Sequence, residues 1–299
     1  MSIGLLFSGQ GAQRVGMGRS LYQNSPSARG LYETANEVLG YDFAQLCFKG
    51  PLEGLTPTEV CQPALYVHGL ASFTVWREIS GEESAALAMG LSLGEFTALA
   101  AAHVYDFEVG LKIVAERGRL MQVACDQAKG TMASVLGGER DEVVALAAEF
   151  EVDLANLNCP GQVVISGPWA HMEQAIRAGR ERGFKRILPL EVAGAYHSRL
   201  MEPARAAFED FLAPIDFRPP RAPVYSNVDA SAARDPAAIK AKLVKQIVSP
   251  VYWEDCMLAA REAGVVTFRE CGVGGVLKGL ARRIDPGFEV ISLQEFADF

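Results

Sequence analysis

The stretch AALAMGLSLGEFTALAAAH, residues 85–103, decides the fold of this chain. Its first residues, Ala85 to Met89, form a small apolar run that suits a strand buried on both faces. Its last residues, EFTALAAAH, are typical of a helix. Because Gly90-Leu91-Ser92-Leu93-Gly94 lies between them, the stretch predicts a strand, a tight turn and a helix in that order.

Strand and helix patterns alternate on both sides of this stretch. Before it, the sequence predicts a strand at Gly4 to Phe7, a Gly-rich turn at Gly9 and Gly11, and a helix over about 63–78. After it, we expect a helix that has Asp106 as its N-cap and reaches about Cys125, and a second helix at 199–212. A Pro-rich stretch at 214–223 then precedes a predicted strand at 223–226. Near the end, VVTFREC at 265–271 predicts a strand, and a helix follows the glycines of GVGGVLKG at 272–279. Such alternation favours a mainly parallel sheet covered on both faces.

The order of the predicted strands and helices changes in the segment between the helix that ends near Cys125 and the helix at 199–212. Here the sequence predicts a strand at 131–136, a helix at 140–150, strands at 152–157 and 162–166, a helix at 168–182 and a strand at 186–190. That β-α-β-β-α-β order is the ferredoxin-like motif, which closes as a compact unit. We therefore expect an α/β protein with a large domain at 1–126 and 196–299 and an inserted small domain at 127–195.

The composition is that of an ordinary globular protein, with 49% hydrophobic and 21% charged residues among 299. A formal net charge of −8 opposes non-specific binding of nucleic acid, which needs a basic surface. The start, MSIGLLFSGQ, lacks the features of a signal peptide, and no apolar run approaches the roughly 20 residues that cross a bilayer. We expect a cytoplasmic protein that binds neither nucleic acid nor membranes.

The cysteines are scattered, with no C-x-x-C pair and no nearby histidine at metal-ligand spacing. They are Cys47, Cys61, Cys125, Cys159, Cys256 and Cys271. We expect reduced, mostly buried thiols and no metal site.

Ser92 is the candidate nucleophile. Gly90-x-Ser92-x-Gly94 has the G-x-S-x-G form of a nucleophile elbow, whose flanking glycines permit the strained turn that exposes the hydroxyl. The start of the following helix offers N–H groups to a developing negative charge. The alternative is a plain strand-to-helix turn.

A serine hydroxyl needs a base to take its proton, and the chain has four histidines. His68, His103 and His171 lie in or beside predicted helices, where an isolated histidine usually makes a structural hydrogen bond. His197 follows a strand and a glycine turn in AGAYHSRLM, which is where loops place such bases. It is the best candidate.

Arg117 carries a second, independent indication. Positions 113, 117 and 121 share one face of a helix, so Arg117 points the same way as Ile113 and Met121, whereas Arg119 points elsewhere and is expected to be solvated. An inward guanidinium can clamp the carboxylate of a substrate in a bidentate manner. The alternative is a pair with a buried aspartate or glutamate.

Seven ordered segments resemble the malonyl-coenzyme A:acyl carrier protein transacylase family, which includes the trans-acting acyltransferases of polyketide assembly lines. They are FSGQGAQ at 7–13, GLSLGE at 90–95, ERGRLMQ at 116–122, NCPGQVVISG at 158–167, AYHSRLM at 195–201, SNVD at 226–229 and KQIVSPVYW at 245–253. The likeness covers nearly the whole chain. It implies a hydrolase-like large domain and a ferredoxin-like small one, with the active site between them.

The resemblance also implies the roles of individual residues. Ser92 would be acylated, with His197 as its base, the backbone N–H groups of Gln10 and Leu93 as the oxyanion hole, and Arg117 as the ligand of the malonyl carboxylate. Further substrate-binding candidates are Gln246, whose main-chain carbonyl would orient the histidine, Asn158 and Gln162, expected near the pantetheine channel, and Tyr196, expected to narrow the pocket towards malonyl rather than methylmalonyl. Most relatives carry histidine where this chain has Leu91, which fits a polyketide-associated member somewhat better.

The implied reaction transfers a malonyl group from coenzyme A to the phosphopantetheine thiol of an acyl carrier protein, with no metal or other cofactor. Because such carriers are acidic, Lys278, Arg282 and Arg283 are candidates for the docking surface, although a solvated helix face is the alternative. Two other functions stay open. One is a hydrolase that clears acyl groups from carrier proteins, and the other is a carrier-docking protein without catalysis.

Overall fold

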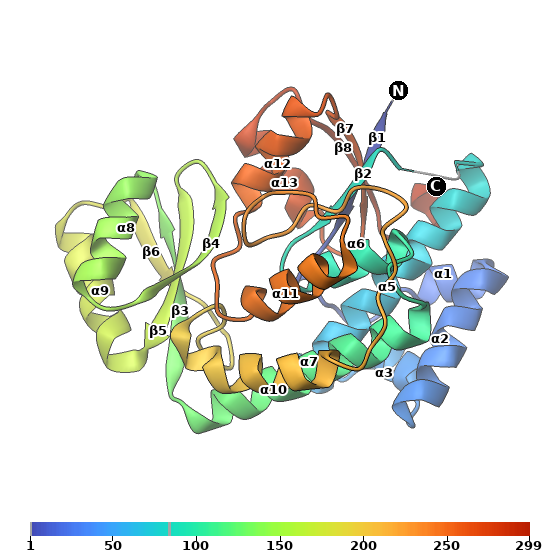
Figure 1. The fold of residues 1–299 in the computed structure, drawn as a ribbon, viewed down its shortest axis with the longest axis horizontal. Coiled ribbons are helices and arrows are strands. Elements are labelled where there is room, and N and C mark those ends of the chain that lie inside the picture. Colours follow the sequence, from blue (N-terminus) through green and yellow to red (C-terminus); the bar gives the residue numbers. More distant parts are fainter. Residues whose placement is uncertain (1, 83–84) are drawn as a thin grey trace.

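The larger sheet is parallel, as the sequence predicts. In the computed structural model, which describes residues 2–82 and 85–299, its strand order is β2-β1-β7-β8 (Figure 1). These strands are β1 (Ile3–Phe7), β2 (Leu87–Gly90), β7 (Thr267–Cys271) and β8 (Glu289–Leu293), and each neighbouring pair is parallel. The edge strand β8 was not predicted.

Helices cover both faces of this sheet. Side chains alternate between the faces of a strand, so Leu5 and Phe7 of β1 join one core and Leu6 joins the other. The first core packs against α5 (Thr58–Ser80), α6 (Leu93–Ala101) and α7 (Phe107–Gln127), and the second against α12 (Trp253–Glu262) and α13 (Val276–Ile284). The expected two-sided cover is therefore confirmed.

Several helices outside these layers were not predicted from the sequence. The remaining helices of the larger part are α1 (Arg19–Asn24), α2 (Pro26–Leu39), α3 (Phe43–Lys49), α4 (Leu52–Leu55), α10 (Glu202–Leu212) after a 3₁₀ turn at Arg199–Met201, α11 (Pro236–Gln246) and a final 3₁₀ turn at Phe296–Asp298. Of these, only the region of α10 was predicted. A signal for α2 was present, because Ser25 caps it by accepting from Ala28 N at 3.1 Å and Pro26 opens its first turn.

The ferredoxin-like part is confirmed. Its antiparallel sheet has the order β4-β5-β3-β6, with two helices against one face, and lies at one end of the molecule (Figure 1). The elements are β3 (Gly130–Leu136), α8 (Arg140–Glu149), β4 (Asp153–Cys159), β5 (Gln162–Pro168), α9 (Trp169–Glu181) and β6 (Arg186–Pro189). The two sheets therefore lie in the two different domains that the sequence predicts. The residues at which these domains begin and end stay a prediction.

The other face of the small sheet lies against the large domain. Val251 N donates to Ala155 O at 2.8 Å, and Leu157 N donates to Val251 O at 2.9 Å, which joins β4 to the segment after α11. Met132 of β3 and Val164 of β5 belong to the main core of the large domain. These contacts fix how the small sheet faces the end of β2.

One local prediction was wrong and another was confirmed in part. The segment at 223–226 is not a strand, because it meets β2 only through a single bridge in which Ala88 N donates to Pro223 O and Tyr225 N to Ala88 O. Proline has no N–H to extend the ladder. Asp106 is the N-cap residue of α7, as predicted, but its carboxylate pairs with Arg218 at 2.6 Å and accepts no capping hydrogen bond.

The cysteines are free and buried, as predicted. Within the residues that the structure describes, no helix is both long and apolar enough to cross a membrane.

Candidate active site

Ser92 lies in a strained turn between β2 and α6, with φ 51° and ψ −103°. The flanking glycines are sterically required. A Cβ on Gly90 would lie 1.9 Å from the carbonyl carbon of Gly94, and a Cβ on Gly94 would lie 2.1 Å from Phe7 O. The elbow predicted from G-x-S-x-G is therefore the one observed, and the plain-turn alternative does not account for its backbone.

Asn227 holds the elbow in place. Its Oδ1 accepts from Ser92 N at 2.7 Å, and its Nδ2 donates to Gly90 O at 2.8 Å. The sequence analysis placed Asn227 in a matching segment but gave it no role. No local pattern could have revealed it, because the contact spans 135 residues.

His197 reaches the hydroxyl. Its Nε2 lies 2.8 Å from Ser92 Oγ, and its Nδ1 lies 2.9 Å from the backbone carbonyl of Gln246. Because a carbonyl only accepts, Nδ1 carries the proton and the lone pair of Nε2 faces the serine. Burial and then the charge of Arg117 lower the pKa of His197 to about 4, so the imidazole is neutral and able to take a proton at neutral pH.

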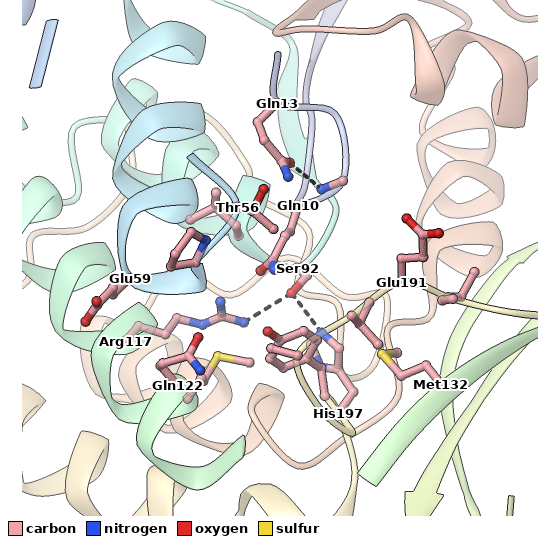
Figure 2. Close-up of a pocket in the computed structure, with 18 of the residues that line it drawn as sticks. Gln10, Gln13, Thr56, Glu59, Ser92, Arg117, Gln122, Met132, Glu191 and His197 are labelled. Carbon is pink, nitrogen blue, oxygen red and sulfur yellow. Dashed lines mark hydrogen bonds between the residues drawn. The ribbon is translucent and has the colours of Figure 1, made fainter. Parts of the chain in front are cut away.

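Arg117 is 1% exposed and points at the same hydroxyl (Figure 2). Its Nη2 donates to Ser92 Oγ at 3.1 Å and to Gln246 Oε1 at 3.0 Å, and its Nη1 donates to Gln62 Oε1 at 2.7 Å. Burial lowers the pKa of Arg117 to about 10, which leaves it charged at neutral pH. Arg117 therefore points inward, as the helical spacing predicts. Among the described residues it forms no ion pair with an acid, so the alternative of a pair with a buried aspartate or glutamate is not observed.

These groups line a cavity of about 720 Å³ between the two domains. Gln10 and Arg117 reach it from the large domain, whereas Met132 of β3 and Glu191 reach it from the small one (Figure 2). Ser92 lies where the two walls meet. The cavity is large enough for an acyl thioester and its pantetheine arm.

Gln10 and Leu93 flank the serine on this wall. Leu93 opens α6, so its N–H has no acceptor within the helix and lies at the positive end of the helix dipole. The side chain of Gln10 is held by Thr58 Oγ1 at 2.9 Å. Among the described residues, neither backbone N–H donates to a backbone acceptor, so both are free to serve as oxyanion donors.

Tyr196 lines the cavity, as expected, and so does Leu91. Asn158 and Gln162, expected near the pantetheine channel, do not line it. Gln162 Oε1 accepts instead from Arg283 of α13 and from the Cys159 thiol at 3.8 Å.

The asparagine that does line the cavity is Asn156. The β4–β5 pairing is irregular on either side of it, with register shifts between Leu154 and Asn156 and between Leu157 and Cys159. Gln246 is fully buried behind Arg117 and is not part of the cavity wall, so its contacts are with the catalytic groups and not with a substrate.

The other histidines have structural positions, as expected. His68 is buried in α5 with Nε2 3.1 Å from Gln294 O, and His171 Nδ1 lies 3.1 Å from Phe150 O. His103 follows α6 with φ 62°, and it lines a separate pocket.

The chain is similar to known acyltransferases over nearly its whole length. Residues 5–278 match the family model described as an acyl transferase domain. The malonyl CoA-acyl carrier protein transacylase of Bacillus subtilis (strain 168) is 39% identical, with 98% of this chain and 93% of that protein covered.

Solved structures agree with this similarity. The crystal structure of an acyl-carrier-protein S-malonyltransferase from Burkholderia pseudomallei 1710b superimposes with a TM-score of 0.96 at 37% identity, covering 100% of this chain and 98% of that one. A malonyl-transacylase solved in complex with its holo type II PKS acyl-carrier protein has the same TM-score at 36% identity, covering 100% and 97%.

Proposed function

The chain belongs to the acyl transferase domain family, and from that premise we propose that it moves a malonyl group from coenzyme A to the phosphopantetheine thiol of an acyl carrier protein. The relatives' names support the reaction. The observation that carries the choice of acyl group is the buried guanidinium of Arg117, whose Nη2 lies 3.1 Å from Ser92 Oγ. A cation at that distance favours an acyl chain that ends in a carboxylate.

In the first half-reaction, His197 takes the proton of Ser92 as Oγ attacks the thioester carbonyl. The N–H groups of Gln10 and Leu93 stabilise the resulting oxyanion. Collapse of the intermediate breaks the carbon–sulfur bond, and the imidazolium of His197 gives its proton to the departing thiolate, so coenzyme A leaves as a thiol and the malonyl group remains as an ester.

The second half-reaction runs the same steps with a different thiol. The phosphopantetheine thiol of the carrier gives its proton to His197 and attacks the ester carbonyl. Ser92 leaves as an alkoxide and recovers that proton. Nucleophile, base and oxyanion donors all come from the protein, so the reaction needs no metal or other cofactor.

Arg117 and Tyr196 select the acyl chain. Arg117 pairs with the free carboxylate of the malonyl ester, in place of its present contact with the hydroxyl. Tyr196 lines the same cavity and narrows it on the side next to the base, which favours malonyl over branched units.

The acidic carrier docks beside the cavity. Lys278, Arg282 and Arg283 are exposed on α13 and give that helix a basic face, although Arg283 already bonds to Gln162. The carrier serves fatty acid or polyketide synthesis in the cytoplasm, and Leu91 at the elbow favours the polyketide assignment.

Intact mass spectrometry tests the proposed reaction. The protein is incubated with malonyl-CoA or acetyl-CoA, and then with a holo acyl carrier protein. We expect a malonyl adduct that is absent in Ser92→Ala and disappears when the carrier is added, with malonyl then found on the carrier. Rapid release of acetate without transfer would instead indicate a hydrolase. Carrier binding without any adduct would indicate a docking protein.

A further inference from the structure

Glu95 is a buried acid that the steps above do not use. It lies in the first turn of α6, three residues after Ser92, and is 3% exposed. Burial raises the pKa of Glu95, while hydrogen bonds from Asn227 and Gln246 and the charge of Arg117 oppose that rise. Because a buried carboxylate is costly unless it is well bonded, its place beside the elbow calls for a physical reason.

The side chain of Gln246 separates Glu95 from Arg117. Its Nε2 donates to Glu95 Oε2 at 2.6 Å and to Ser92 O at 3.1 Å, while its Oε1 accepts from Arg117 Nη2 at 3.0 Å. An amide can donate only from nitrogen and accept only at oxygen. The carboxylate of Glu95, together with Ser92 O, therefore determines which end of the amide faces the guanidinium.

This arrangement differs from an ordinary buried ion pair. A carboxylate in direct contact with Arg117 would form a bidentate pair and occupy the donors that a substrate needs. With the amide between them, the negative charge of Glu95 still offsets that of the buried guanidinium through a medium of low dielectric. The Nη2 group meanwhile stays directed at Ser92 Oγ.

A backbone contact keeps Glu95 in this place. Asn227 N donates to Glu95 Oε2 at 3.0 Å, and the side chain of the same Asn227 braces Ser92 N. The carboxylate is thus tied to the residue that holds the elbow and to the amide that holds the guanidinium. Two residues that both contact Ser92, namely Asn227 and Gln246, thus hold the carboxylate in position.

We propose that Glu95 is a positioning residue whose carboxylate holds the Gln246 amide between itself and Arg117. Arg117 thereby keeps a buried counter-charge and still offers its Nη2 edge to a carboxylated acyl group on Ser92. The inference rests on the proposed function and adds to it the group that holds a neutral amide, instead of an acid, against Arg117.

Exchanging the two side chains tests this directly. The double variant Glu95→Gln/Gln246→Glu keeps the net charge and nearly the same volume, but it places the carboxylate in direct contact with Arg117. We expect the rate of Ser92 malonylation by malonyl-CoA to fall on the order of 10- to 100-fold, as for loss of a charge-assisted hydrogen bond. Residue 246 also contacts Ser92 O, so the readout is the ratio of this rate to the rate of labelling by an uncharged fluorophosphonate, and we expect that ratio to fall.

Two single variants complete the experiment. Glu95→Gln removes the counter-charge and the charged acceptor of the amide, so we expect the ratio of the malonyl rate to the fluorophosphonate rate to fall here too. Glu270→Gln is the matched control, because Glu270 is another acid with 0% exposure, accepting from Leu277 N at 2.8 Å and from Ser292 Oγ at 2.7 Å. It should lower the melting temperature and leave the ratio unchanged.

The outcomes separate the inference from the proposed function. A wild-type protein that takes up no malonyl group overturns both. If the wild type is malonylated and the exchange variant keeps its malonyl rate, or loses both rates equally, the inference alone is wrong. Should the exchange variant fail to fold, an unchanged ratio in Glu95→Gln overturns it.

Discussion

Arg117→Ala removes the group on which the choice of acyl chain depends. The substitution deletes hydrogen bonds to Gln62 at 2.7 Å, to Ser92 Oγ at 3.1 Å and to Gln246 at 3.0 Å. It also removes a cation–π contact in which the guanidinium carbon lies 5.0 Å from the centroid of the Phe96 ring. Both glutamine oxygens lose their donor, and the substrate carboxylate meets an uncharged, buried wall.

The size of the effect follows from these contacts. A hydrogen bond to a charged group contributes about 1.5–3 kcal/mol, so loss of a two-bond contact with the malonyl carboxylate costs about 3–6 kcal/mol. That corresponds to a fall of about 10²- to 10⁴-fold in kcat/KM for malonyl-CoA. Breaking a buried charge network by removing one partner also destabilises a fold by about 3–5 kcal/mol, so the melting temperature should fall as well.

The assay is the time course of Ser92 acylation with malonyl-CoA and with acetyl-CoA, followed by intact mass at a temperature where the variant is folded. We expect the malonyl rate to collapse while the acetyl rate is unchanged or higher. Arg117→Lys keeps the charge without the planar fork and should lie between the two. If the variant loses both rates in the same proportion, or keeps its preference for malonyl, the reasoning about the guanidinium is refuted.

Gly90→Ala should lower the free energy of unfolding by more than about 4 kcal/mol because the new Cβ has no room, whereas Gly279→Ala on the open face of α13 should raise it by about 0.5–1 kcal/mol. Chemical denaturation measures both changes, and equal effects would contradict the steric argument. The neutral form of His197 is the base and its pKa is lowered to about 4, so the acylation rate should stay level as the pH falls to about 5 and drop only below that; a rate already lost near pH ~6.5 would show that the base titrates normally. Asn227→Ala leaves two buried backbone groups at the elbow unpaired, which should cost about 1–3 kcal/mol in denaturation and slow acylation; an unchanged acylation rate would mean that the elbow does not need this brace.

Local sequence was sufficient wherever the deciding physics is local. The elbow at Ser92 could be predicted because the G-x-S-x-G pattern is local and the steric demand on Gly90 comes from Gly94, four residues away. The demand on Gly94 is different, since it comes from the distant Phe7 of β1 and is visible only in the structure. The inward direction of Arg117 could be predicted from the helical period alone. The small domain was also predicted, because its strand and helix patterns are short, regular and joined by short turns.

Elements whose order depends on distant partners were missed. The strand β8 is a short edge strand whose partner in the sheet is β7. The segment at 223–226 failed as a strand, since its neighbour β2 accepts it at one bridge and no more. In both cases the pairing partner decides, and the sequence does not reveal it.

The amino-acid sequence by itself determined the α/β class, the inserted ferredoxin-like motif, the strained serine and an inward guanidinium, because sterics and periodicity act over a few residues. Only the tertiary structure decided that His197, 105 residues from Ser92, lies at hydrogen-bond distance from its hydroxyl. It alone brought Glu95, Gln246 and Asn227 together behind that hydroxyl and placed Asn156 in the wall of the cavity. The physical reason is that a site is built from contacts between elements, and their directions are fixed only when the cores on both faces of the sheet and between the domains have packed.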